Sequence, residues 1–139
     1  MDRISPEHRS EVMRRIKSKG TKPEMTVRGL VHGMGYRYRL HRPDLPGKPD
    51  LVFGPKRKVI FVHGCFWHGH ERVGCAHVRH PKSNTAYWQP KLARNKERDV
   101  RHKRLLKQMG WKVLTVWECE TIEELASVRR RIRAFLERA

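Results

Sequence analysis

The sequence predicts an α/β domain in which a mixed β-sheet is flanked by helices. Its 139 residues are enough for one domain with a modest core, and the chain contains no internal repeat or low-complexity segment. The spacing of apolar residues changes from a helical period to alternation and back, which gives the element order ααβββαβα. Helices in this order are expected to cover the faces of the sheet. We therefore assign residues 1–139 to a single domain.

Two helices are expected before the first strand. Ser5 and Pro6 provide a cap and a first helical proline, and Gly20 is a typical end for this helix. Thr21 begins a second helix, which breaks at residues 33–35. The expected inner face of this second helix contains Val27, Leu30 and Val31.

Three strands follow in a row. Residues 36–40 alternate with a period of two, residues 50–53 form a short apolar run, and residues 58–63 are apolar and β-branched. Residues 41–49, rich in proline, are predicted to be a loop.

The C-terminal half adds a helix, a strand and a helix. A basic helix is expected over residues 89–109, a buried strand over 111–117 with Trp111 and Trp117 in the core, and a last helix over 121–138. The apolar residues of the first helix are Leu92, Val100, Leu105 and Leu106. The expected inner face of the second contains Ile122, Leu125, Val128, Ile132, Phe135 and Leu136.

The charge of the chain indicates a polyanionic partner. There are 32 Lys and Arg against 14 Asp and Glu, and both halves of the chain are basic. Nucleic acid is favoured over an anionic membrane or a ribosomal role, because neutralising phosphates releases counterions. No apolar stretch is long enough to span a bilayer and no amino-terminal signal pattern is present, so we expect a cytoplasmic protein. Candidate phosphate contacts are Arg14, Arg15, Lys17, Lys19 and the basic helix over 91–107.

Residues 61–75 have the composition of a chemical site. Three histidines, two cysteines and an adjacent Phe-Trp pair occur in fifteen positions, just after an apolar run. Imidazole and thiolate bind transition metals, imidazole is a common general base, and large aromatics stack on nucleobases. The longer segment 64–88 has no periodicity, and loops of that length in compact domains are usually functional.

A carboxylate is expected beside this segment. Asp50 opens the second strand, while His63 ends the third, so the two residues are predicted at neighbouring strand ends. This placement suits Mg²⁺, which takes oxygen ligands and can activate water toward a phosphodiester. The competing interpretation is that Asp50 only caps a turn. His68 follows closely and is a candidate general base.

Four runs of the chain resemble the very short patch repair (Vsr) endonucleases. They are PGKPD at residues 46–50, IFVHGCFWH at 60–68, NKERD at 95–99 and GWKVLTVWEC at 110–119. The resemblance covers nearly the whole chain in the right order. It implies a restriction-endonuclease-like fold of the PD-(D/E)xK type and a magnesium-dependent nick 5′ of the thymine in a T·G mismatch, the lesion left by deamination of 5-methylcytosine.

The resemblance also implies roles for single residues. Asp50 looks like the metal-binding aspartate, with the backbone carbonyl of Val62 as a second ligand, and His68 looks like the catalytic base. His63 and Glu24 look like supporting groups of the water and metal network. Two departures stand out. The usual nuclease signature ends in an acidic residue, one spacer and a lysine, whereas this chain has Val62, His63 and Gly64, so histidine chemistry must replace the lysine. Val62 also stands where the Vsr pattern often has threonine. Glu24 is also three residues after Thr21, so a capping-box role competes.

A structural zinc ion is the second expected metal. Cys65, His70 and Cys75 are spaced by five residues, and Cys119 follows the last strand, which together form a Cys3His set of four ligands. Structural zinc drawn from these positions is also what the resemblance implies. The alternatives are His77 or His80 as the histidine ligand, and simple burial of three separate thiols.

The aromatic residues of the same segment are expected to reach the bases. By resemblance, Phe66, Trp67 and Trp88 intercalate next to the mismatch, where unstacking a base step is easier. Packing of Trp88 against the helix that follows is the competing role.

The expected function is a strand-specific mismatch nicking endonuclease that acts as a bacterial, cytoplasmic monomer on double-stranded DNA with a T·G mismatch, with a MutL-like repair protein as a possible partner. Two alternatives stay open. One is a nicking or restriction enzyme for intact duplex DNA, and the other is a zinc-stabilised DNA-binding module without catalysis.

Overall fold

A four-stranded mixed sheet forms the centre of the computed structural model, which describes residues 21–65 and 85–138. The strands are β1 (Arg39–Leu40), β2 (Leu51–Phe53), β3 (Lys58–His63) and β4 (Lys112–Trp117), and they lie in the order β1-β2-β3-β4. The pairs β1–β2 and β2–β3 are antiparallel, whereas β3 and β4 are parallel. The predicted mixed sheet flanked by helices is therefore confirmed.

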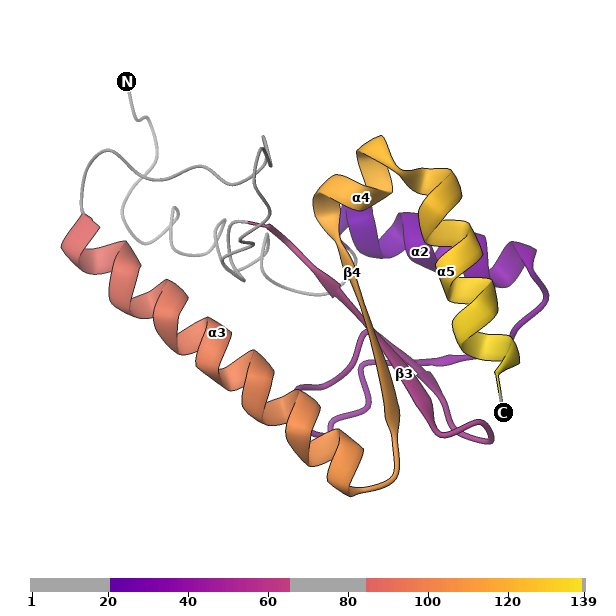
Figure 1. Cartoon of the computed structure of the whole chain (residues 1–139), viewed down its shortest axis with the longest axis horizontal. Helices are drawn as coiled ribbons and strands as arrows, with labels where there is room; N and C mark the ends of the chain where they lie inside the picture. The colour runs from indigo at the N-terminus through magenta and orange to yellow at the C-terminus, as the bar shows by residue number, and fades with distance from the viewer. Residues whose placement is uncertain (1–20, 66–84, 139) are drawn as a thin grey trace.

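Helices cover both faces of the sheet, as Figure 1 shows. One face is covered by α2 (Lys22–Gly33), α4 (Glu118–Glu123) and α5 (Leu125–Glu137), and the other by α3 (Thr85–Gln108). The helix α3 lies between β3 and β4 in the chain. A parallel pair requires such a connection, because the chain must return to the edge where β3 began before β4 can start. The carboxyl ends of β3 and β4 consequently lie together, with His63 paired to Trp117.

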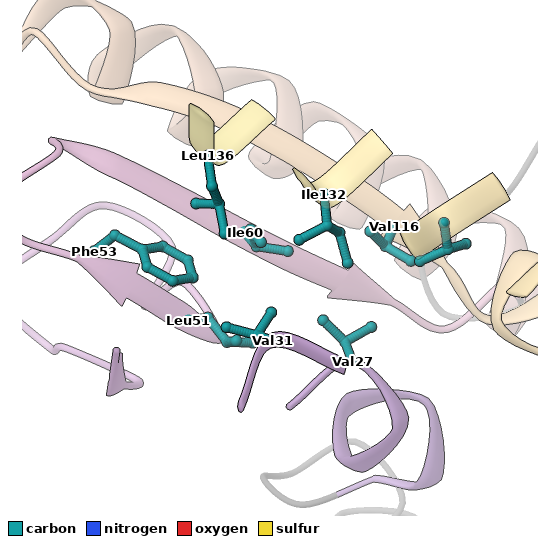
Figure 2. Packing of buried hydrophobic residues seen from close by; sticks show 9 residues of the cluster. Val27, Val31, Leu51, Phe53, Ile60, Val116, Ile132 and Leu136 are labelled. Atoms are coloured by element: carbon teal, nitrogen blue, oxygen red, sulfur yellow. The ribbon is translucent and has the colours of Figure 1, made fainter. Parts of the chain in front are cut away.

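Two apolar clusters fill the space between the sheet and the helices. In the larger cluster, Val27 and Val31 of α2 and Ile132 and Leu136 of α5 pack on the sheet (Figure 2). The smaller cluster joins Leu106 of α3 and Trp111 to the opposite face. The spacing of four residues in α2 and in α5 is that of a helix with one buried face.

Several predicted boundaries differ from the structure. The strand predicted over 36–40 pairs only at Arg39–Leu40, and the helix predicted from residue 89 already begins at Thr85. The last predicted helix is divided into α4 and α5, because the backbone at Glu124 (φ −133°, ψ 41°) leaves the helical region. The helix predicted over residues 5–20 lies outside the described residues.

Part of the predicted inner faces was wrong. Trp111 is buried as expected, whereas Trp117 is only partly buried. In α3, Leu106 is buried and Leu92 is partly buried. Ile122 and Leu125 were expected on the inner face of the last helix and are exposed, and the apolar Val100 and Leu105 of α3 are exposed as well. In α3 the core residue is Leu106, near the C-terminal end of the helix. In α5 the buried residues begin at Val128, so Leu125 precedes the part of this helix that packs on the core.

None of the helices within residues 21–65 and 85–138 is both long and apolar enough to cross a membrane.

Candidate active site

Three side chains from separate parts of the chain meet at one end of the sheet. His41 Nε2 lies 2.9 Å from Glu24 Oε1 and 3.6 Å from Asp50 Oδ1. One donor atom from each of the three residues lies within 4.8 Å of the other two. Two carboxylates and an imidazole this close together form a suitable site for a divalent cation.

Asp50 is held by the strand beside it. Its Oδ2 accepts a 2.6 Å hydrogen bond from the backbone amide of Val62, near the end of β3. Since this bond joins two strands rather than closing a local turn, the carboxylate has a fixed place in the sheet. Asp50 Oδ1 is the oxygen that faces His41.

Glu24 reaches the site from the first turn of α2. Thr21 Oγ1 caps this helix and accepts a hydrogen bond from the Glu24 backbone amide at 3.4 Å. The Glu24 carboxylate is almost fully buried and contacts His41 and, at 3.5 Å, Arg28 Nη1. The residue is therefore part of the helix start through its backbone and part of the site through its side chain.

His41 is the site residue that the sequence alone did not indicate. It lies directly after β1 in the left-handed region (φ 47°), and its backbone amide donates to the Asp50 carbonyl at 3.4 Å. Its place among proline-rich loop residues concealed it. The signal that could have found it is the antiparallel pairing of β1 with β2, which sets residue 41 opposite residue 50.

The electrostatics of the site favour a bound cation. Burial raises the pKa of Asp50 to about 7; the Val62 amide acts against this shift, and the nearby Glu24 carboxylate adds to it. A carboxyl group that is hard to ionise beside a second carboxylate gains most from a positive charge between them. The donor set thus fits Mg²⁺, with Asp50 and Glu24 as oxygen ligands.

The His63 side chain lies apart from the group of Glu24, His41 and Asp50. Its ring contacts Trp117 in an edge-on arrangement (5.2 Å between centroids) and Phe61 at 5.6 Å. Phe61 packs on the cluster beneath α3, whereas Val62 packs on the opposite face of the sheet. His63 therefore points to the face away from Glu24. The roles predicted for His63 and for the Val62 carbonyl stay predictions.

Two of the predicted zinc ligands lie side by side. Cys65 and Cys119 are both fully buried, and the backbone amide of Cys119 donates to Cys65 Sγ at 3.4 Å. Cys65 follows β3 and Cys119 is in the first turn of α4, so the fold brings together positions 54 residues apart in the chain. Several other predicted site residues lie outside the described residues, namely Phe66, Trp67, His68, His70, Cys75, His77 and His80, together with the side chain of Trp88.

The loop that joins His41 to Asp50 rests on α3. Gly47 in this loop has φ 77°, and a Cβ added there would lie 2.8 Å from His102 Nδ1 and 3.1 Å from His102 Cβ. A side chain at position 47 would thus meet both backbone strain and a contact shorter than real Cβ atoms show.

We expect Gly47→Ala to lower the free energy of unfolding by roughly 2 to 3 kcal/mol, about 1 to 2 from the left-handed backbone and the rest from the contact. Urea unfolding measures this loss. Gly35→Ala is the matched control, because Gly35 has φ 86° and no atom within 4 Å of an added Cβ. Equal losses in the two variants would show that His102 does not restrict position 47.

Comparison with known proteins identifies the family. Residues 1–74 match the family model described as DNA mismatch endonuclease Vsr. The DNA mismatch endonuclease Vsr of Escherichia coli is 42% identical over 111 residues, which is 80% of this chain and 69% of that protein. The chain belongs to the Vsr DNA mismatch endonuclease family.

Two further relatives match along more than nine tenths of both chains. The Type II nicking enzyme V.XorIIP of Xanthomonas oryzae pv. oryzae is 50% identical over 136 residues, which is 98% of this chain and 97% of that protein. The Type II nicking enzyme V.NmeAIP of Neisseria meningitidis is 43% identical over 131 residues, 94% of this chain and 91% of that protein. Membership confirms the Vsr resemblance and the restriction-endonuclease-like fold, and it makes this Vsr chain a DNA endonuclease.

Proposed function

We propose that this Vsr chain is a magnesium-dependent endonuclease that nicks one strand 5′ of the thymine in a T·G mismatch and so starts very short patch repair. The observation that supports this most is the group of Glu24, His41 and Asp50, whose donor atoms are within reach of a single cation. The identity to a relative named a DNA mismatch endonuclease supports the mismatch as substrate.

The chemistry proposed is hydrolysis of one phosphodiester bond. Asp50 and Glu24 would hold Mg²⁺, with the Val62 carbonyl as a further ligand, and the ion would stabilise the charge that develops on the phosphate. His68 would take the proton from the attacking water as its oxygen forms a new bond to phosphorus, while the opposite P–O bond breaks and the leaving sugar oxygen takes up a proton from solvent. The Val62 amide, which donates to Asp50 Oδ2, keeps this carboxylate oriented.

DNA binding is proposed to use the basic surface and the aromatic residues. The exposed cations of α3 include Arg94, Arg98, Arg101, Arg104 and Lys107, which suit contacts to phosphates. Phe66, Trp67 and Trp88 are the proposed wedge at the mismatch. Structural zinc bound by Cys65, His70, Cys75 and Cys119 is proposed to tie this wedge segment to the sheet. The monomeric state and a MutL-like partner stay predictions.

A second function remains a candidate because of the relatives. V.XorIIP and V.NmeAIP are named Type II nicking enzymes, and a name of this kind fits an enzyme that nicks intact duplex. The group of Glu24, His41 and Asp50 and the membership of an endonuclease family argue against the third alternative, a binding module without catalysis.

A pair of labelled duplexes separates the two candidates. We expect Mg²⁺-dependent nicking of the thymine strand in a T·G duplex, at least about a hundredfold faster than in the same sequence with a T·A pair. Each strand carries its own label, and the surrounding sequence is varied across a panel. Equal cleavage of the two duplexes would assign the chain to intact DNA, and no cleavage of any duplex would favour the binding module.

A further inference from the structure

We infer that His41 binds the catalytic cation directly through Nε2, and that this nitrogen ligand shifts the preference of the site from Mg²⁺ toward Mn²⁺. The inference rests on the proposed function for the presence of a cation. It concerns a residue to which neither the sequence pattern nor the family resemblance assigned a role.

The geometry places His41 as a third ligand and not merely as a neighbour. Adjacent ligands on an octahedral ion with bonds near 2.1 Å lie about 3 Å apart. His41 Nε2 lies 2.9 Å from Glu24 Oε1 and 3.6 Å from Asp50 Oδ1, so its distances to both carboxylates are near this value. All three donor atoms lie within 4.8 Å of one another, so side-chain adjustments would bring them onto one ion.

The second oxygen of Asp50 defines where the ion would lie. Asp50 Oδ2 accepts the Val62 amide at 2.6 Å, which leaves Oδ1 as the oxygen on the side of His41. The ion that binds Asp50 through Oδ1 is therefore next to the imidazole. An imidazole that only oriented Glu24 would need to approach one carboxylate, whereas Nε2 lies close to two.

Burial gives the site a closed side and an open side. The Glu24 side chain is 2% exposed, that of His41 11% and that of Asp50 21%. Glu24 and His41 thus form the inner wall, and the side near Asp50 is open to water and to a phosphate. An inner wall of one oxygen and one nitrogen leaves room for the solvent ligands that catalytic ions keep.

The mixed ligand set has a consequence for metal choice. Imidazole suits first-row transition metals, whereas Mg²⁺ prefers ligand sets made of oxygen atoms. A site with two carboxylates and one imidazole is accordingly expected to bind Mn²⁺ more tightly than Mg²⁺, while either ion can still be held through Asp50 and Glu24.

The test measures metal binding by the zinc-loaded protein without DNA. We expect Mn²⁺ bound to the wild-type protein to show the ¹⁴N coupling of a directly bound imidazole in pulsed electron paramagnetic resonance. His41→Gln should lose that coupling and bind Mn²⁺ at least about tenfold more weakly. Its affinity for Mg²⁺, measured by competition, should change less than about threefold. His41→Asn is the second variant, because asparagine tolerates the left-handed backbone at this position.

Controls distinguish loss of the His41 ligand from loss of structure. They also distinguish failure of this inference from failure of the proposed function. His32→Gln replaces an exposed histidine on the same helix as Glu24 and should retain both the coupling and the affinity. Thermal unfolding without added Mn²⁺ or Mg²⁺ verifies that the variants fold. A wild-type spectrum without ¹⁴N coupling, or one that both His41 variants retain, overturns the inference and leaves the nicking activity unaffected. Intact coupling in a protein that does not nick T·G duplexes contradicts the proposed function alone.

Discussion

Asp50→Asn is expected to reduce nicking of a T·G duplex by at least about a thousandfold while the protein stays folded. Loss of the charged oxygen that faces His41 removes the main attraction for the cation. Stabilisation of a phosphoryl transition state by a metal ion contributes several kcal/mol, or roughly three powers of ten in rate, and this contribution would be lost. The asparagine keeps the size of the side chain and can still accept the Val62 amide through its oxygen. Single-turnover cleavage at saturating enzyme measures the effect.

Asp44→Asn is the matched control for that variant. Asp44 is in the same loop, but its carboxylate is exposed and bound to Arg42 at 2.6 Å, away from the three-residue group. We expect its nicking rate to stay within about twofold of wild type, because exposed ion pairs contribute little to stability. If Asp50→Asn retained activity within tenfold of wild type, Asp50 would not be the main ligand of the catalytic ion.

The same substitution should change how stability depends on pH. Burial holds the pKa of Asp50 at about 7 in the folded protein, above its ordinary value of 3.8. A raised pKa means that the folded state binds the proton more tightly, so this contribution is complete below about pH 4 and is lost as pH rises through 7. Each pKa unit corresponds to about 1.4 kcal/mol. Without added magnesium, the free energy of unfolding of wild type should fall by on the order of 3 kcal/mol relative to that of Asp50→Asn between pH 4 and pH 8.

Urea unfolding of both proteins at several pH values measures this difference. The comparison between the two removes the titration of groups remote from Asp50, and the difference reports the interacting pair of Asp50 and Glu24. Saturating Mg²⁺ should reduce the slope, because the ion binds the ionised carboxylate of the folded state. Parallel pH profiles for the two proteins without magnesium would show that Asp50 ionises normally in the fold.

The sequence predicted the larger features of the fold because these depend on local pattern. The buried spacing of Val128, Ile132 and Leu136 and the β-branched run of β3 are visible in the chain and confirmed in the structure. The exposure of Ile122 and Leu125 was not visible, because the break at Glu124 decides which side of the final helices meets the sheet. Periodicity describes a face of a helix, but not how far along the helix a neighbour extends.

The candidate site shows the same limit more clearly. Asp50 was predicted from a carboxylate at a strand end and from the resemblance to the Vsr family, and Glu24 was predicted from the resemblance alone. His41 was missed, because its importance depends on strand register: the pairing of Leu40 with Leu51 sets His41 beside Asp50. Register is a non-local property, fixed by the two strands together with their loop, and no single stretch of the sequence contains it.

The largest effect on stability is expected from the thiols. We expect wild-type protein to contain one zinc ion per chain when purified without added zinc, and Cys119→Ala to contain none and to lose cooperative unfolding. The proposal rests on two fully buried thiols brought together from β3 and α4, with a backbone amide donating to Cys65 Sγ. Structural zinc contributes about 10 to 16 kcal/mol in small zinc-binding peptides, which is comparable to the whole stability of a typical domain. Elemental analysis and thermal unfolding measure the two losses.

A buried residue that carries no thiol distinguishes metal loss from ordinary loss of packing. Val116→Ala creates a small cavity in the core beside the paired strand β3, and should lower stability by about 1 to 3 kcal/mol while the protein retains its zinc. If the thiols were simply packed, Cys119→Ala would behave like Val116→Ala, with a modest loss of stability and an unchanged metal content. A zinc-free wild-type protein that unfolds cooperatively and nicks DNA would contradict the zinc proposal, because the wedge segment would then be held to the sheet without it.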